Sequence, residues 1–250
     1  MSKQKSVADS AGKKLPPQGL IIFGGESFSG KTVLMTGLCA ALQDEGHTVK
    51  AIKPVCIGSR LAVEAELSFI SRICLSKIDY PVSLLGGPGR LSEAEWAQTI
   101  GAARNSPRVT LLELPGSCAT PLSFVEDKRQ FWRDGADLSV ELGWPCLLVV
   151  RYGLKTVEQF LLNAESLILR GADLIGLVAV ETTADSHQGL YPDNLGLALS
   201  ERVQVPFLGC IPYSQSISVL DQSQGNLKKL VANSLDLLPV MKRLELPLLV

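Results

Sequence analysis

The sequence has few of the residues that build metal centres and disulfide frameworks. Its 250 residues include two histidines, His47 and His187, and six cysteines with no C-x-x-C pair. A zinc site needs Cys or His ligands at short spacings, and a disulfide framework is typical of short secreted chains. We therefore expect neither, and we interpret the cysteines, which stand mostly inside apolar runs, as small buried hydrophobic residues in a reducing cytoplasm.

Long apolar runs and an excess of one charge are also missing. Arg151 interrupts the longest apolar candidate, so no run reaches the roughly 18 residues of a membrane span. Charged residues make up 20% of the chain and the net charge is -1, which gives no general attraction to nucleic acid or to an anionic membrane. We expect a cytoplasmic protein without either partner, in which any phosphate ligand is held by a local site.

The length and the 46% hydrophobic content suit one sizeable α/β domain, expected over residues 19–250. Residues 1–18 contain four lysines, two prolines and no apolar core. They match neither a secretory signal nor a folded segment, so a disordered tail is predicted there.

One stretch carries a recognisable chemistry. Residues 25–32 match G-x-x-x-x-G-K-[ST], the pattern of a phosphate-binding loop, and comprise Gly25, Glu26, Ser27, Phe28, Ser29, Gly30, Lys31 and Thr32. In such a loop backbone N–H groups surround a phosphate, the lysine reaches the terminal phosphates and the hydroxyl holds Mg2+. An apolar run at 20–23 and a helix-like segment at 33–42 supply the strand and helix that the motif requires. An ordinary glycine-rich turn is the alternative.

Strands and helices alternate along the rest of the chain. This predicts a single-domain α/β P-loop fold with a mostly parallel sheet and helices on both faces. Further strands are expected over 48–55, 109–114, 146–150, 174–182 and 207–211. Helices are expected over 33–45, 62–75, 93–103, 157–170, 194–202 and 227–238, with helical pieces within 126–142. Loops or turns are expected over 56–60, 77–92, 115–117 and 120–123, and Thr156 is expected to cap a helix whose N-terminus suits a carboxylate.

Two charged residues stand near the carboxyl ends of predicted strands. Lys53 ends the strand after the phosphate loop, and Glu113 is the one acid in the apolar run at 109–114. Ligands of parallel α/β sheets bind outside the carboxyl ends of the strands. Lys53 is therefore a candidate for a second positive charge in the site, and Glu113 for a magnesium ligand. A solvent-facing lysine and an edge-strand glutamate are the alternatives.

The order and spacing of these motifs resemble the dethiobiotin synthetase family from about Leu20 to Tyr213. Residues 25–32 correspond to the family's G-T-D-T-x-x-G-K-T loop, residues 53–55 to its K-P-V stretch and Glu113 to the acid of its V-E-G-A-G-G segment. Further matches are residues 120–122 for T-P-L, 153–156 for G-L-G-T, 176–178 for the penultimate strand and 206–212 for P-x-L-G-x-I-P.

The resemblance implies an ATP-dependent ligase of biotin synthesis. A carbamate on 7,8-diaminononanoate is phosphorylated by ATP, and the second amine then closes the ureido ring to give dethiobiotin, ADP and phosphate. It implies a homodimer, with the helix after Thr156 near the partner. By resemblance the catalytic residues are Lys31 and Lys53. The Mg2+ ligands are Thr32, Glu113 and Glu64, with Glu66 as fallback, and the nucleotide also meets Val180 and Pro212. The substrate contacts are Ile57, Gly116, Ser117, Leu154, Lys155 and Thr156.

The residues that depart from the family pattern are mostly those expected to contact the organic substrate or the nucleotide base. Residues 114–117 read Leu-Pro-Gly-Ser where the family has G-A-G-G, Lys155 replaces a glycine, and Glu158 replaces an asparagine. Val180 stands where an asparagine commonly reads adenine, with Glu181, Thr182 and Thr183 as stand-ins. In the loop itself, Glu26 stands where an aspartate is usual.

Three hypotheses follow. The first is a divergent dethiobiotin synthetase, including a form that takes an already carbamylated substrate. The second is a catalytically weak nucleotide-binding regulatory module. The third is another ATP-dependent carboxylate-activating enzyme such as the synthetase half of a cobyrinate amidating enzyme, whose usual glutaminase domain the residues after Tyr213 are too few to supply.

Overall fold

The computed structural model describes residues 19–75, 83–85, 91–105, 109–124, 132–184 and 192–247. The predicted tail at 1–18 and most of the predicted loop at 77–92 lie outside these residues. Within the described part of the chain, no helix is long and apolar enough to cross a membrane. The six cysteines are free thiols and five of them are buried.

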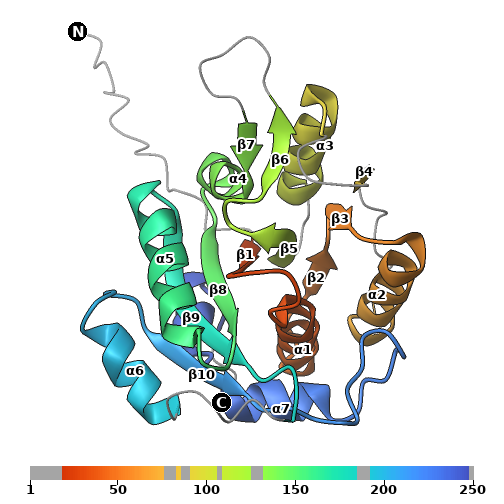
Figure 1. Cartoon of the computed structure of the whole chain (residues 1–250). Helices are drawn as coiled ribbons and strands as arrows, with labels where there is room; N and C mark the ends of the chain where they lie inside the picture. The colour runs from red at the N-terminus through yellow and green to blue at the C-terminus, as the bar shows by residue number, and fades with distance from the viewer. Residues whose placement is uncertain are drawn as a thin grey trace, which may run out of the picture.

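Six strands form a parallel central sheet in the order β10-β9-β8-β1-β5-β2 (Figure 1). The strands are β1 (Gly19–Gly24), β2 (Val49–Ile52), β5 (Val109–Ser117), β8 (Pro145–Arg151), β9 (Asp173–Val180) and β10 (Phe207–Ile211). The predicted α/β P-loop architecture is confirmed. Because β1 lies between β5 and β8, the loop that follows it opens at the middle of the sheet's carboxyl edge.

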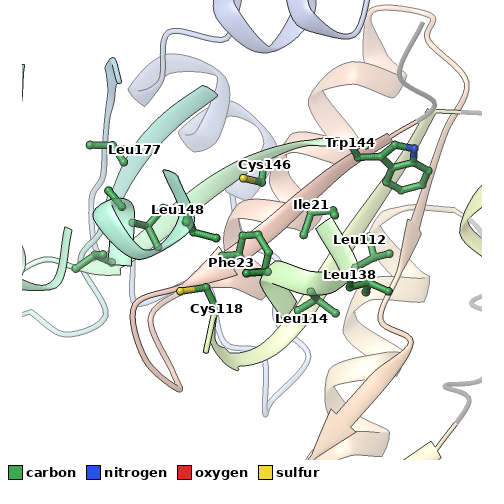
Figure 2. Packing of buried hydrophobic residues seen from close by; sticks show 14 of the residues in the cluster. Ile21, Phe23, Leu112, Leu114, Cys118, Leu138, Trp144, Cys146, Leu148 and Leu177 are labelled. Carbon is green, nitrogen blue, oxygen red and sulfur yellow. The ribbon is translucent and has the colours of Figure 1, made fainter. Parts of the chain in front are cut away.

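The strands read as apolar runs because both faces of the sheet are covered. All six residues of β1 are buried, and successive side chains point to opposite faces. Ile21 and Phe23 belong to one apolar cluster, called here the Phe23 cluster, and Leu20 and Ile22 belong to the other, called the Leu20 cluster. Figure 2 shows Ile21 and Phe23 among other side chains of the Phe23 cluster.

Each cluster is closed by its own set of helices, which confirms helices on both faces. The Phe23 cluster is covered by α3 (Glu93–Arg104), α4 (Gly135–Leu142), α5 (Thr156–Leu169) and α6 (Pro192–Ser200). The Leu20 cluster is covered by α1 (Lys31–Asp44), α2 (Arg60–Ile73), α7 (Leu227–Ser234) and α8 (Leu238–Arg243).

Two small strand pairs lie outside the central sheet, and the sequence predictions for them were wrong. β3 (Val55–Ile57) pairs in parallel with β4 (Ser83–Leu85), where loops were expected. β6 (Pro121–Phe124) pairs antiparallel with β7 (Trp132–Asp134), where a polar loop and helical pieces were expected. β3 and β4 are distant in the sequence, whereas β6 and β7 follow each other closely. In both pairs the local composition indicated loops or helical pieces although a partner strand exists.

Two element boundaries also differ from expectation. The turn predicted at 115–117 lies within β5, which continues to Ser117. The helix predicted over 227–238 is two helices, because Leu235 is extended and bridges Gly209 before Pro239 enters the first turn of α8.

Candidate functional site

The loop between β1 and α1 depends on two glycines for different reasons. Gly30 has φ +93°, and a Cβ there would lie 2.6 Å from Val180 Cγ1. A Cβ on Gly24 would lie 2.5 Å from Lys31 Nζ. Gly30 therefore supplies the left-handed turn into α1, and Gly24 leaves the space that the lysine side chain occupies.

The residues between these glycines are unusual. Phe28 has φ +60° and its side chain is 85% exposed at the tip of the loop. Ser29 is buried, and its Oγ has no hydrogen-bond partner among the described residues. The Glu26 carboxylate is 3.8 Å from Arg151 Nε, and the Gly25 N–H donates to Val149 O at 2.8 Å. Since the N–H of Gly25 is used by the sheet, phosphate must be held by later N–H groups, including those of the first turn of α1.

Lys31 lies across the loop. Its Nζ donates to the backbone oxygens of Glu26 and Gly116, each at 3.0 Å. Burial lowers the pKa of Lys31, and the positive charge of Lys53 lowers it further, while Glu113 acts in the opposite direction. Its contacts with neutral carbonyls do not compensate the ammonium charge fully, so an anion at this position would be stabilised.

Lys53 directly follows β2, and its side chain contacts a buried group of two carboxylates and one hydroxyl. Its Nζ is 2.5 Å from Glu66 Oε1 and 2.7 Å from Glu113 Oε1. Thr32 Oγ1 is 2.7 Å and 3.0 Å from the same two oxygens. Burial by itself would lower the pKa of Lys53, but the two carboxylates outweigh it and raise the pKa. The ammonium is therefore charged throughout the physiological range.

The same group has the donor atoms of a magnesium site. Glu113 is 1% exposed, and its Oε2 has no hydrogen-bond partner among the described residues. Two carboxylates and a hydroxyl form the all-oxygen set that Mg2+ prefers, and Mg2+ usually keeps water and phosphate as its other ligands. No group of three or more His, Cys, Asp or Glu residues able to hold a metal occurs among the described residues.

Glu66, rather than Glu64, is the second acid of this group. Glu64 is paired with exposed Arg60 at 2.7 Å on the outer side of α2. Glu66 is spaced three and four residues from the buried Val63 and Ile70, so it lies on the inward side of α2. This spacing can be read from the sequence, but the resemblance placed Glu64 first and Glu66 as the fallback.

The turn between β8 and α5 differs from the predicted cap. Thr156 is the first helical residue, and Lys155 takes the N-cap position without a side-chain cap. The buried Thr156 Oγ1 accepts from Gly153 N–H at 2.7 Å and is 2.6 Å from Gly153 O, so its hydroxyl is used within the turn. Leu154 and Lys155 have exposed side chains, and they remain substrate candidates.

The predicted substrate wall at Gly116 and Ser117 meets the phosphate loop. Gly116 has φ +65° and accepts from Lys31 Nζ, and Ser117 N–H donates to Thr120 Oγ1 at 2.8 Å. Although Pro115 precedes it within β5, Gly116 still adopts a positive φ. Ile57 ends β3 and is 39% exposed.

On the base side, the side chain of Val180 is buried, and its contact with a nucleotide stays a prediction. Its side chain is 3% exposed and packs against the backbone of the phosphate loop at Gly30. The next residue, Glu181, accepts from Tyr213 N–H at 3.0 Å through Oε2 and so joins the ends of β9 and β10. Pro212 is exposed beside this contact.

One contact on α2 had no sequence signal. Gln222 has φ +56°, and its Oε1 accepts from Arg72 Nη2 at 2.8 Å and from Ser68 Oγ at 3.0 Å. The segment after β10 is thereby fastened to the helix that carries Glu66.

Comparison with known proteins agrees with this geometry. The ATP-dependent dethiobiotin synthetase of Xanthomonas oryzae pv. oryzae (strain PXO99A) is 27% identical over 229 residues, which cover 84% of this chain and 98% of that protein. The enzyme of the same name from Janthinobacterium sp. (strain Marseille) is 28% identical over 219 residues, covering 76% of this chain and 86% of that protein. The chain is thus similar to proteins named dethiobiotin synthetase over most of its length.

Solved structures show the same fold beyond the dethiobiotin synthetases. A chain of the MinC:MinD cell division protein complex from Aquifex aeolicus has a TM-score of 0.55 and 13% identity, covering 93% of this chain and 97% of that one. A ParA family ATPase from Chlorobium tepidum has a TM-score of 0.51 and 13% identity, covering 86% and 96%. A family described as AAA domain matches residues 133–219. At this identity the solved structures show a shared fold and nothing further.

Proposed function

We propose that this chain is an ATP-dependent dethiobiotin synthase acting on 7,8-diaminononanoate or its carbamate. The observation that carries the proposal is that Thr32 and Lys53 both contact the carboxylates of Glu66 and Glu113 beside the phosphate loop. Similarity to the dethiobiotin synthetases over most of the chain supplies the reaction. A cytoplasmic location is part of the proposal.

The residues divide the work of phosphoryl transfer. Lys31 and the N–H groups at the start of α1 bind the phosphates of ATP. Thr32, Glu66 and Glu113 are the residues that would hold Mg2+, which supplies neutralisation of phosphate charge when bound. Lys53 provides positive charge for the carbamate oxygen that accepts the phosphoryl group. The second amine then attacks the carbamoyl carbon, and phosphate leaves as the ring closes.

The test is production of dethiobiotin by the purified chain. With ATP, Mg2+, bicarbonate and 7,8-diaminononanoate, we expect dethiobiotin and ADP in equal amounts by mass spectrometry and a coupled ADP assay. Reactions without the diamine are the control, and they should release ADP at background rate.

If the chain binds nucleotide but its rate of ADP release does not change when the diamine is added, the proposed enzyme activity is contradicted. That result would support the nucleotide-binding regulatory module instead. A further arm supplies preformed carbamate. Faster turnover with carbamate than with diamine and bicarbonate would assign this chain the phosphorylation and ring closure only, as the altered wall at Pro115 and Glu158 favours. Equal rates would reject that narrower form.

A homodimer is also proposed, with α5 at the interface. This helix exposes Leu162 and Leu169, 59% and 87% accessible, on its outer side. Sedimentation equilibrium is expected to give twice the 26.8 kDa chain mass. A monomer at assay concentration would remove this part of the proposal.

Glu66→Gln should weaken the apparent affinity of the enzyme for Mg2+, whereas Glu64→Gln should not. Loss of one carboxylate ligand is expected to raise the Mg2+ concentration needed for half-maximal ADP release by about 10-fold or more. Glu64 is paired with Arg60 in solvent, so its variant is a matched control on the same helix. Mg2+ titrations of ADP release measure both, and equal curves for the two variants would contradict the assignment of Glu66.

A further inference from the structure

The two carboxylates assigned to Mg2+ already hold a cation that belongs to the chain. Lys53 Nζ contacts Oε1 of both Glu66 and Glu113, the same atoms that meet Thr32. A magnesium ion at its usual distance of about 2.1 Å from either oxygen would lie within about 5 Å of this ammonium. The ammonium and a divalent ion therefore compete for the same oxygens.

The charges of this buried group are balanced without a metal. Lys31 and Lys53 are each 6% exposed, Glu113 is 1% exposed, and the Glu66 side chain is 23% exposed. Two lysines offset two glutamates, so a divalent ion entering alone would leave an uncompensated double charge in a poorly solvated place. A nucleotide triphosphate carries more negative charge than one magnesium ion neutralises. A metal ion that takes Glu66 and Glu113 deprives Lys53 of both its partners. The metal–nucleotide complex supplies phosphate anions that can replace them, whereas free metal supplies none.

We propose that this site takes a divalent cation only as its nucleotide complex, and that Lys53 is the internal counter-ion that keeps free metal out. When the complex enters, Lys53 leaves Glu66 and Glu113 for the incoming anions, the terminal phosphate and the carboxylate-like carbamate. The inference rests on the nucleotide and cation site of the proposed function but not on the identity of the organic substrate.

The experiment measures binding of Mn2+, a paramagnetic substitute for Mg2+, with and without ATP. Free Mn2+ is counted by electron paramagnetic resonance for wild type, Lys53→Met, Lys53→Arg and Lys50→Met. Without ATP, wild type should show no saturable binding at submillimolar Mn2+, and Lys53→Met should bind Mn2+ at least about 10-fold more tightly because one positive charge is removed. Lys53→Arg keeps the charge, and Lys50→Met alters a lysine within β2 instead of the one that follows it. Both should, like wild type, show no saturable Mn2+ binding without ATP.

Folding of each variant is checked by circular dichroism, and Lys53→Gln replaces Lys53→Met if the latter does not fold. Tight Mn2+ binding by wild type without ATP would overturn the inference. Equal Mn2+ affinity of wild type and the neutral variant, with Mn2+–ATP binding intact in wild type, would also overturn it. Failure of wild type to bind Mn2+–ATP would instead overturn the proposed nucleotide site on which the inference rests.

Discussion

Lys31→Ala is expected to lower kcat/KM for diamine-dependent ADP release by about 1,000-fold, which corresponds to about 4 kcal/mol of transition-state stabilisation. The lysine is buried at the loop with two backbone carbonyls as its hydrogen-bond partners, so its charge is available to a phosphate that displaces them. Phosphoryl transfer depends on positioning and charge neutralisation more than on covalent chemistry. Steady-state kinetics with a coupled ADP assay measure the loss.

Lys228→Ala is the matched control for this prediction. Lys228 is a partly exposed lysine paired with Asp44 at the end of α1, away from the loop. The Lys228→Ala variant should retain wild-type kinetics. The kcat/KM of Glu113→Ala should fall as that of Lys31→Ala does, because the substitution removes a proposed metal ligand. A Lys31→Ala enzyme within about threefold of wild type would refute a phosphate-binding role for this lysine.

Gly30→Ala is expected to destabilise the protein by about 3 kcal/mol. An alanine at φ +93° costs about 1–2 kcal/mol, and crowding a packed core costs about 1–3 kcal/mol. For a chain of this size, that lowers Tm by about 6–12 °C. Thermal unfolding followed by circular dichroism measures the shift, and loss of nucleotide binding should accompany it because the turn into α1 is distorted.

Gly143→Ala separates the two causes. Gly143 caps α4 with φ +67°, and a Cβ there would meet no atom within 4 Å. The free energy of unfolding of the Gly143→Ala variant should therefore fall only by the cost of the positive φ, about 1–2 kcal/mol. Adding Val180→Ala to Gly30→Ala should recover part of the crowding term in a double-mutant cycle. Equal losses at Gly30 and Gly143, with no coupling to Val180, would show that Val180 does not crowd the loop.

The central sheet and the phosphate loop were predictable from sequence because their causes are local. A strand buried on both faces must be an apolar run, as β1 and β8 are, and a phosphate loop must carry its glycines at fixed positions. Lys53 and Glu113 could be placed at one edge because parallel strands end at that edge. Their direct contact follows from side-chain packing that no spacing rule describes.

The misplaced predictions share a different cause. Glu64 and Glu66 differ by two positions on a helix, which turns them to opposite sides, and only the buried face of α2 decides between them. The residue aligned with an adenine-reading asparagine, Val180, is buried because Gly30 leaves room for it. β3 and β4 pair across a long connection. In each case the outcome depends on a partner that is distant in the sequence.

The central position of β1 sets when the nucleotide site can form during synthesis. The phosphate loop follows β1, the first strand of the described residues, yet β1 pairs with β5, over Val109–Ser117, and with β8, over Pro145–Arg151. Non-local parallel pairing forms slowly and leaves edges exposed until the partners arrive. A nascent chain halted before residue 145 would contain every residue of the loop, Lys53 and Glu113 but lack one neighbour of β1. We therefore expect ATP affinity to appear only after β8 has left the ribosome.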